Sequence, residues 1–387
     1  MSGLRFEFAT ATRVVFGPGS LAELGPLAAA LGRRALLVTG RTPERAEAAR
    51  ERLASAGVAT IAFSVIGEPT VEDARRGAEL GRAEKADLVV ACGGGSVIDA
   101  GKAVAALLGN GGDPLDYLEV VGRGRPIALA SVPFVAIPTT AGTGSEVTRN
   151  AVLSSPEHRV KASLRSPLML PRAAIIDPDL LLGLPASVVA ASGLDAFAQL
   201  VEPFVSVRAN PLVDALCREG LARSARSLRR AYDGDRSEAV RVDLALASLF
   251  GGLALANAGL GAVHGLAAPL GGMFDAPHGA TCAALLPAVL RTNLEALKHR
   301  RPESPGLGRY REIATIVTGR ADARASDGVA WVEALVRALE VPGLARWGAT
   351  ASDVPALVAK ARAASSMKGN PVELDEKELA GIVRSSL

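Results

Sequence analysis

The sequence predicts two parts of different class: an α/β part with a parallel sheet, followed by a part that is entirely α-helical. Two observations lead to this prediction. Apolar strand-like runs alternate with amphipathic helical runs along the first half of the 387 residues, and strand signals stop near residue 181. Strands that are apolar throughout are typical of a parallel sheet covered by helices on both faces. We therefore place a domain boundary between residues 1–180 and 181–387.

Six strands and four helices are expected in the first part. The expected strands are the apolar runs 13–17, 33–40, 60–67, 86–94, 132–140 and 172–178. The expected helices are 21–32, 45–57, 71–85 and 97–110. The first two of these helices end near Gly32 and Gly57, as helix C-termini commonly do.

The second part is read as helices at 185–205, 211–232 and 238–259, with shorter pieces around 307–319, 327–340, 352–365 and 375–387. Residues 244–274 lack Asp, Glu, Lys and Arg, and are longer than the ~20 residues that cross a bilayer. This stretch is rich in Ala and Gly, contains Asn257 and Pro269, and has no flanking aromatic anchors. We therefore predict packed helices of a soluble domain, in which glycines such as Gly251 and Gly265 let backbones approach closely.

Composition argues against several classes of partner. The formal net charge is only +3, no block of Lys or Arg is visible, and aromatic residues make up 4%, so nucleic-acid binding has little support. The three cysteines, Cys92, Cys217 and Cys282, show no paired spacing, which predicts free thiols. The N-terminal residues lack a signal-peptide pattern, so we expect a cytoplasmic protein.

A glycine-rich turn, CGGGSVIDAGKAVA at 92–105, follows one expected strand and opens an expected helix. Glycines let the backbone approach a ligand closely, and the free N–H groups at a helix start favour phosphate. Ser96 is expected to cap this helix, with Asp99 three residues later as in a capping box. An ordinary strand–helix turn has the same pattern, and the dinucleotide fingerprint G-x-G-x-x-G is absent.

A second polar loop, AIPTTAGTGSEVT at 136–148, also follows an apolar strand. Its hydroxyl side chains include Thr139, Thr140, Thr143 and Ser145. Ligands of open α/β sheets bind at the carboxyl ends of strands, where such hydroxyls and amides would lie. Two loops of this kind on one sheet favour a nucleotide site more than either does alone, although a self-satisfied polar loop is the alternative.

Four residues of the second part form a candidate metal or catalytic set. Asp195 and Gln199 lie four apart and share a helix face, and His264 and His278 follow in a second segment. A carboxylate, an amide oxygen and two imidazoles could surround one divalent cation. A histidine that merely bonds to the backbone is the alternative for each ring. The other two histidines, at 158 and 299, stand in charged stretches and are expected to be solvated.

Taken together, these motifs resemble the iron-containing (group III) alcohol dehydrogenases, a family of the dehydroquinate synthase-like superfamily. The similar segments are GGGSVIDAGKAVA at 93–105, IPTTAGTGSEVT at 137–148, AIIDPDLLLGLPASVVAASGLDA at 174–196, and HGLAAPLGG…PHG at 264–279. The resemblance covers nearly the whole chain. It implies a Rossmann-like N-terminal domain, a helical C-terminal domain and an active-site cleft between them. It also implies a homodimer or larger homo-oligomer.

The resemblance further implies NAD(P)-dependent oxidation of an alcohol, or reduction of the corresponding aldehyde or ketone. Gly94, Gly95 and Ser96 would hold the pyrophosphate, and the threonines at 139, 140 and 143 would follow the cofactor toward the nicotinamide. Lys161 would lie near the ribose and phosphates. Asp195, Gln199, His264 and His278 match the metal positions, where Fe²⁺ or Zn²⁺ would polarise the substrate oxygen.

Four departures from the family pattern qualify this picture. Gln199 stands where the family usually has a histidine ligand, which leaves open whether a metal is bound. Ala268 stands where many members have a second histidine that could relay the alcohol proton. Gly40 replaces an Asp that often binds the ribose 2′-OH, and the adjacent Arg41 adds a positive charge, so we expect NADP to be tolerated or preferred. Glu68, in GEPT, replaces a common Pro-Asn-Pro-Thr.

Three other functions compete with a metal-dependent dehydrogenase. One is a metal-free reductase resembling maleylacetate reductase, which would need cationic groups such as Arg149 and Lys161 near its oxo-acid substrate. Another is a lyase resembling dehydroquinate synthase, whose additional motifs we do not find. The last is a degenerate nucleotide-binding protein, which Gln199 and Ala268 would suit but the intact cofactor loops would not.

Overall fold

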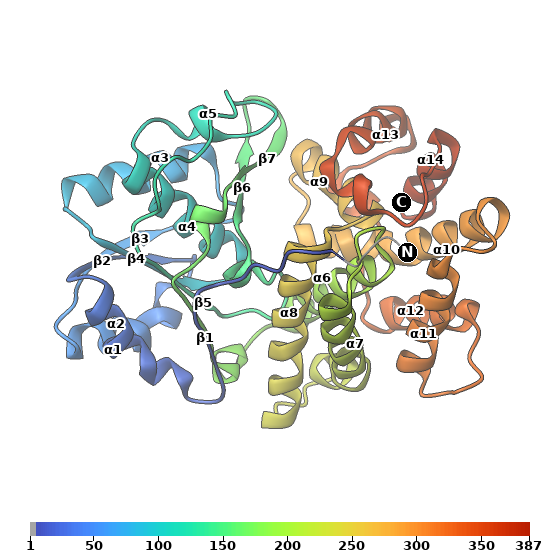
Figure 1. Cartoon of the computed structure of the whole chain (residues 1–387), viewed down its shortest axis with the longest axis horizontal. Coiled ribbons are helices and arrows are strands. Elements are labelled where there is room, and N and C mark those ends of the chain that lie inside the picture. The colour runs from blue at the N-terminus through green and yellow to red at the C-terminus, as the bar shows by residue number, and fades with distance from the viewer. Residues whose placement is uncertain (1–4) are drawn as a thin grey trace. The chain divides into compact units, whose positions relative to one another are not determined.

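The structure is a computed structural model, and it describes residues 5–387. The chain divides into two compact units (Figure 1). Of the described residues, one unit comprises 9–140 and 144–182, and the other comprises 183–387 together with the short segments 5–8 and 141–143. We call them the sheet unit and the helical unit, and describe each by itself.

The sheet unit is built on six parallel strands in the order β1-β8-β5-β4-β2-β3. Their bounds are β1 Val14–Phe16, β2 Arg34–Thr39, β3 Ala59–Ser64, β4 Leu88–Gly93, β5 Phe134–Pro138 and β8 Ala173–Ile176. All six strands lie within one or two residues of the predicted runs or inside them. The α/β fold class predicted from the apolar strands is therefore confirmed, because β4, β5 and β8 are buried along their whole length.

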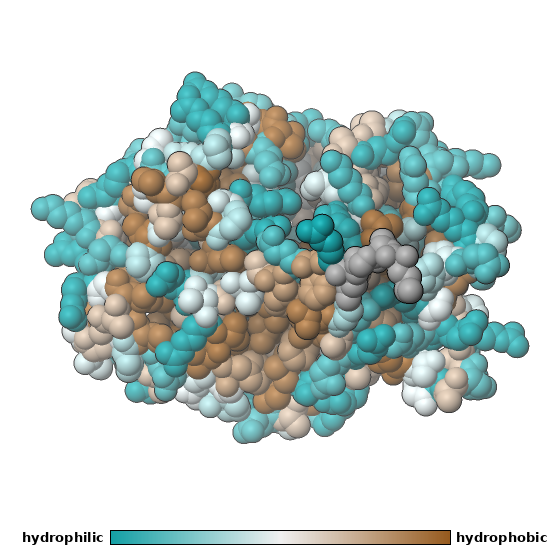
Figure 2. All heavy atoms as spheres, viewed as in Figure 1, coloured by the Kyte–Doolittle hydropathy of each residue, from teal (hydrophilic) through white to brown (hydrophobic). Residues whose placement is uncertain are grey.

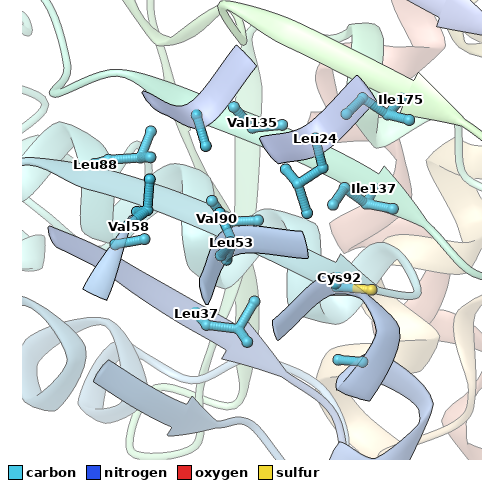
Figure 3. Packing of buried hydrophobic residues seen from close by; sticks show 14 of the residues in the cluster. Leu24, Leu37, Leu53, Val58, Leu88, Val90, Cys92, Val135, Ile137 and Ile175 are labelled. Atoms are coloured by element: carbon cyan, nitrogen blue, oxygen red, sulfur yellow. The ribbon is translucent and has the colours of Figure 1, made fainter. Parts of the chain in front are cut away.

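Helices cover both faces of this sheet (Figure 1). On one face pack α1 (Leu24–Leu31) and α2 (Glu47–Ser55), whose Leu24 and Leu53 meet Leu37, Val90 and Ile137 of the strands (Figure 3). On the other face packs α4 (Gly95–Asn110), backed by α3 (Val71–Ala83). Cys92 lies in the first core, where burial raises the pKa of its thiol to about 12.

An antiparallel hairpin in the sheet unit was not predicted from the sequence. Strands β6 (Asn150–Ser155) and β7 (Val160–Arg165) pair with each other, outside the main sheet. The alternation of buried and partly exposed residues along both strands is the period of two that a half-buried strand shows. The runs are short and contain several polar residues, so they do not stand out by hydrophobicity.

The helical unit contains nine helices among the described residues. They are α6 Ala186–Val205, α7 Pro211–Tyr232, α8 Glu238–Ala258, α9 Ala262–Phe274, α10 His278–Arg300, α11 Pro305–Thr318, α12 Ala325–Ala338, α13 Val354–Ala363 and α14 Glu376–Ser385. Seven of them match predicted helical runs. The bounds of α9 and α10 were not predicted, because Pro269 and Pro287 interrupt their sequences.

Small residues allow the close helix packing that was expected in the charge-free stretch. A Cβ at Gly251 of α8 would lie 3.2 Å from both the Ala196 carbonyl oxygen and Gln199 Cβ of α6. A Cβ at Gly265 of α9 would lie 2.8 Å from Met367 Sδ. These glycines therefore let α8 pack against α6, and α9 against Met367, more closely than a larger side chain would allow.

Two helices of this unit, α6 and α8, are long and apolar enough to cross a membrane by length and composition alone. In their most apolar windows, 83% of α6 and 56% of α8 is buried inside the protein. Burial of this kind is typical of core helices in a soluble domain. The half-exposed residues of α8 include Val242, Leu246, Phe250 and Leu253, and Figure 2 shows hydrophobic residues along this helix.

Candidate metal centre and dinucleotide site

A cluster of buried donor atoms forms where α6, α9 and α10 meet. Asp195 of α6, His264 of α9 and His278 of α10 supply an oxygen and two ring nitrogens. His264 Nε2 lies 3.3 Å from Asp195 Oδ1, and His278 Nε2 lies 3.7 Å from the same oxygen. The structure thus brings together three of the four residues that the sequence pointed to, from segments up to 83 residues apart.

The helices explain this convergence. Asp195, Gln199 and Glu202 occur at i, i+4 and i+7 on α6, so they share one face. His264 stands in the first turn of α9, and His278 is the first residue of α10. Each imidazole is thereby placed by a helix start.

Glu202 holds His264 in a fixed orientation. Its Oε2 lies 2.6 Å from His264 Nδ1, and its Oε1 accepts a hydrogen bond from the Val263 backbone N–H at 2.7 Å. With Nδ1 donating to the carboxylate, His264 Nε2 keeps its lone pair for another partner. Carboxylate–histidine pairs of this kind orient metal ligands in proteins. Glu202 was not singled out from the sequence, although its position seven residues after Asp195 was a usable signal.

Two buried acceptor atoms of the cluster, and one on the neighbouring Gln199 of α6, lack a hydrogen-bond partner. They are Asp195 Oδ1, His264 Nε2 and Gln199 Oε1, all on residues that are at most 6% exposed. Buried polar atoms are almost always hydrogen-bonded, and two acceptors 3.3 Å apart repel one another unless a cation lies between them. The residues present therefore fit a divalent metal ion.

The charges around the cluster are consistent with this. Although burial favours the neutral carboxylic acid, the nearby imidazoles lower the pKa of Asp195. Electrostatic interactions with Cys282 and with the Asp195 carboxylate outweigh burial and raise the pKa of His278 to about 9. The surroundings of the Asp195 carboxylate therefore favour positive charge, which a divalent cation would supply.

Cys282 is a member of the cluster that the sequence analysis did not identify as a site residue. Its Sγ lies 3.7 Å from His278 Nε2, and the donor atoms of Asp195, His264, His278 and Cys282 all lie within 4.8 Å of one another. Cys282 follows His278 by one helical turn of α10. Because that helix was not predicted, the i, i+4 relation between the two residues was not visible.

A second candidate site lies at the carboxyl edge of the sheet, where β4 and β5 are neighbours. Gly93 and Pro138 pair in register, and the Thr139 N–H donates to the Gly93 carbonyl oxygen at 2.9 Å. The glycine turn and the start of the polar loop therefore lie side by side, as predicted. Thr140 stands against Gly94, where an added Cβ would lie 3.3 Å from its Oγ1.

The start of α4 differs from the prediction. The helix begins at Gly95 with Gly94 as N-cap, so Ser96 lies in the first turn and does not cap it, and no side chain caps it. Asp99 forms no capping box, because its carboxylate accepts hydrogen bonds from Ser145 Oγ and the Val152 N–H. An uncapped helix start leaves backbone N–H groups for an anion, which fits a dinucleotide pyrophosphate.

Lys102, one of the most buried residues, ties the polar loop to α4. Its Nζ donates to the Ser145 carbonyl oxygen and Oγ, to Thr148 Oγ1 and to the Asn150 carbonyl oxygen at 2.7–3.0 Å. Asp99 lies 3.7 Å away. The hydroxyl of Ser145 is therefore used inside the protein. Ser145 was predicted as a cofactor-binding residue, and the structure shows it supporting the loop.

Glu146 of the same loop gives a prediction of pH dependence. It is 2% exposed, and burial raises its pKa from 4.5 to about 7. The folded state therefore holds the proton more tightly than the unfolded state, and Glu146 increasingly destabilises the fold as pH rises from about 4.5 to 7.

We expect Glu146→Gln to stabilise the protein more at pH 8 than at pH 5, by about 2–3 kcal/mol. Denaturant unfolding of both proteins at the two pH values measures this difference. Glu157→Gln, at an exposed turn, is the matched control and should show no such pH dependence. An equal effect of Glu146→Gln at both pH values would contradict the prediction.

The remaining predicted cofactor residues take different places. Gly40 directly follows β2, beside the glycine turn of β4, and Arg41 is exposed. Lys161 on β7 is buried, and its Nζ lies 3.4 Å from Glu68 Oε1, which gives the unusual Glu68 a partner. Thr143 groups with the helical unit, where its neighbour Gly142 packs against Ser192 of α6.

The fold and the two sites define a class: an α/β unit with a dinucleotide-type edge, joined in one chain to a helical unit with a metal-type donor cluster. Models of known families agree. Residues 11–178 match the family "Iron-containing alcohol dehydrogenase", and residues 189–387 match "Fe-containing alcohol dehydrogenase family, C-terminal". The chain belongs to the iron-containing alcohol dehydrogenase family.

Individual relatives cover the full length. The chain is 34% identical to the 1,3-propanediol dehydrogenase of Klebsiella pneumoniae over 100% of both chains. A crystal structure of a 1,3-propanediol oxidoreductase superposes with a TM-score of 0.92 at 33% identity, covering 99% of this chain and 100% of that one. The sulfoacetaldehyde reductase of Bifidobacterium kashiwanohense in complex with NAD⁺ has a TM-score of 0.87 at 26% identity, with 99% of each chain covered. The chain is accordingly an oxidoreductase that acts on the CH–OH group of donors or reduces the corresponding carbonyl.

Proposed function

We propose that the chain is a metal-dependent NAD(P)H-linked dehydrogenase for small primary alcohols and their aldehydes. The observation that carries the proposal is the pair of buried acceptor atoms without partners, on Asp195 and His264, within a cluster that also contains His278. Similarity to 1,3-propanediol dehydrogenase supports a short alcohol as substrate. A bound divalent metal would supply Lewis acidity toward the substrate oxygen while hydride moves between the nicotinamide and the substrate carbon.

We propose the following roles for residues of the chain. Asp195, His264 and His278 are the catalytic metal ligands, with Gln199 as an additional weak oxygen donor. Residues 1–180 bind the dinucleotide and residues 181–387 bind metal and substrate. The pyrophosphate binds at Gly94, Gly95 and Ser96, supported by the uncapped start of α4.

The threonines at 139, 140 and 143 line the cofactor in this proposal, and Lys161 stands near its phosphates with Glu68 moderating its charge. Ser145 acts by holding the loop through Lys102. Ala268 lies one turn after His264 on α9. Because an alanine cannot relay a proton, we propose that the alcohol proton leaves through water or the ribose hydroxyls.

The proposal is tested by metal analysis of the purified protein together with chelation. Activity with 1,3-propanediol and other short alcohols should be lost on chelation and restored by Fe²⁺ or Zn²⁺. Activity that survives exhaustive chelation, with no metal detected, would instead support the metal-free reductase that Gln199 also suits. A parallel screen of oxo-acids separates that alternative by substrate. Nucleotide binding without turnover of any substrate would indicate a degenerate member.

Gly40 gives a prediction about cofactor choice. A Cβ at this position would lie 3.5 Å from Val97 Cγ2, an ordinary contact, so a larger residue fits. We expect Gly40→Asp to shift the ratio of kcat/KM for NAD over NADP upward by roughly tenfold or more, because a carboxylate binds the ribose 2′-OH and repels a 2′-phosphate. Gly381→Asp, at an exposed position of α14, is the control. An unchanged ratio would show that Gly40 does not face the adenosine ribose.

The proposed assembly and location follow from other features. The half-exposed apolar residues of α8 support a homo-oligomer, since a contiguous apolar stripe is commonly covered by a partner. Analytical ultracentrifugation measures the oligomeric state directly. Three free buried cysteines agree with a reducing compartment, and we propose a cytoplasmic location.

A further inference from the structure

We propose that Cys282 is a metal ligand of this chain and provides the fourth strong donor that Gln199 cannot. The inference rests on the proposed metal-dependent function and deepens it. It assigns a donor set of one carboxylate, two imidazoles and one thiolate, formed by Asp195, His264, His278 and Cys282.

The separations of the donor atoms support this set. Bonds of about 2.0–2.3 Å to one ion, at angles near tetrahedral, place neighbouring donors about 3.3–3.7 Å apart, and a fifth position would remain for the substrate oxygen. The distances from Asp195 Oδ1 to His264 Nε2 and His278 Nε2 are 3.3 Å and 3.7 Å, and Cys282 Sγ lies 3.7 Å from His278 Nε2. The thiol therefore stands at the distance of a ligand, from a helix that already supplies another ligand.

The surroundings of Cys282 also distinguish it from an ordinary core cysteine. It is fully buried, one turn after His278 on α10, and interacts with the side chains of Asp195 and both histidines. Cys92, in contrast, lies among leucine, valine and isoleucine side chains (Figure 3). A buried thiol whose sulfur lies within 4.8 Å of two imidazole nitrogens and a carboxylate oxygen has the environment of a metal ligand.

Comparison with Gln199 favours the sulfur. A neutral amide oxygen is a weak donor for a transition metal, whereas a thiolate is a strong and soft one. Oxygen and nitrogen ligands suit iron(II), and a soft sulfur donor shifts preference toward zinc. We therefore expect the chain to select Zn²⁺ over Fe²⁺ more strongly than a variant without this sulfur.

Cobalt substitution tests the ligand directly. The metal-free protein is titrated with Co²⁺, and the near-ultraviolet spectrum is recorded for the parent, for Cys282→Ser and for the control Cys217→Ser. Cys217 is likewise fully buried but lies on α7, outside the cluster. We expect a thiolate-to-cobalt charge-transfer band in the parent and in Cys217→Ser, and no such band in Cys282→Ser. Zinc affinity should fall in Cys282→Ser by at least the roughly 10–100-fold that loss of an outer-shell partner of a ligand costs.

The outcomes are distinguishable. One equivalent of bound Co²⁺ without the charge-transfer band in the parent protein would overturn the role of Cys282 and leave the metal-dependent function standing. Failure of the parent to bind Co²⁺ or Zn²⁺ at all would overturn both. Since the parent spectrum decides these cases, the test does not depend on whether Cys282→Ser folds.

Gln199→His supplies an independent arm. If Cys282 already provides the fourth strong donor, this substitution should raise zinc affinity by less than about tenfold in the parent, and by much more in the Cys282→Ser background. Equal gains in both backgrounds would contradict the proposal, because they would show that the sulfur does not share the ion.

Discussion

Asp195→Asn is expected to remove most of the activity, on the order of 10³-fold or more in kcat/KM, equivalent to roughly 4 kcal/mol of barrier. The Asp195 carboxylate lies 3.3 and 3.7 Å from the two imidazole nitrogens and supplies the carboxylate of the cluster. An amide of the same shape keeps the packing but removes the charge that holds a cation. Steady-state kinetics and metal content, measured on the same preparations, check the prediction.

A graded series makes this prediction sharper. Glu202→Gln leaves all the proposed ligands in place and weakens only the orientation of His264, so metal affinity should fall about 10–100-fold and be recovered at higher metal concentration. Asp322→Asn, whose side chain is 80% exposed in the same unit, should match the parent. Full activity in Asp195→Asn would show that the cluster is not the catalytic centre.

Lys102→Met should destabilise the sheet unit by about 3–5 kcal/mol, the usual cost of removing one partner from a buried charge pair. Methionine fits the volume of the lysine stem but leaves four acceptors and Asp99 without their cation. Denaturant unfolding measures the loss. Dinucleotide affinity should fall as well, because the loop at 139–148 loses its attachment to α4.

Two further variants control for this experiment. Lys85→Met removes an exposed lysine of the same unit and should change the free energy of unfolding by less than about 0.5 kcal/mol. Adding Asp99→Asn to Lys102→Met should restore part of the lost free energy of unfolding. The neutral amide removes the buried negative charge that Lys102 otherwise balances. A loss of less than about 1 kcal/mol in the free energy of unfolding of Lys102→Met would contradict the prediction. It would mean that water replaces the ammonium group as hydrogen-bond donor.

Much of the fold could be predicted because its signals are local. The apolar strands and the glycines that end helices are features of a few neighbouring residues, and they predicted all six parallel strands. The hairpin of β6 and β7 was not predicted because its strands are buried by packing against the segment around Thr70 and against the core behind it. That packing is a property of the tertiary structure.

The site divides in the same way. Asp195, His264 and His278 could be proposed because few residue types can bind a metal and only four histidines exist. Cys282 and Glu202 depend on knowing which helix faces converge. The predicted capping role of Ser96 was wrong because α4 begins at the preceding glycine. The Ser145 hydroxyl binds the buried Lys102 Nζ inside the protein. Lys102 lies 43 residues before Ser145, so the sequence does not show that they meet.

The pairing of β1 with β8 has a consequence for how the chain acquires its structure. Val14 lies beside Ala174, so the outermost strand of the sheet comes from the first residues and its only neighbour from the last strand of the unit. During synthesis β1 cannot pair with β8 until about 160 later residues have been added. One edge of β5 stays unpaired until β8 emerges. Contacts of such long sequence separation slow folding. The sheet unit is therefore completed late, and its vulnerable period for aggregation falls between the emergence of β5 and that of β8.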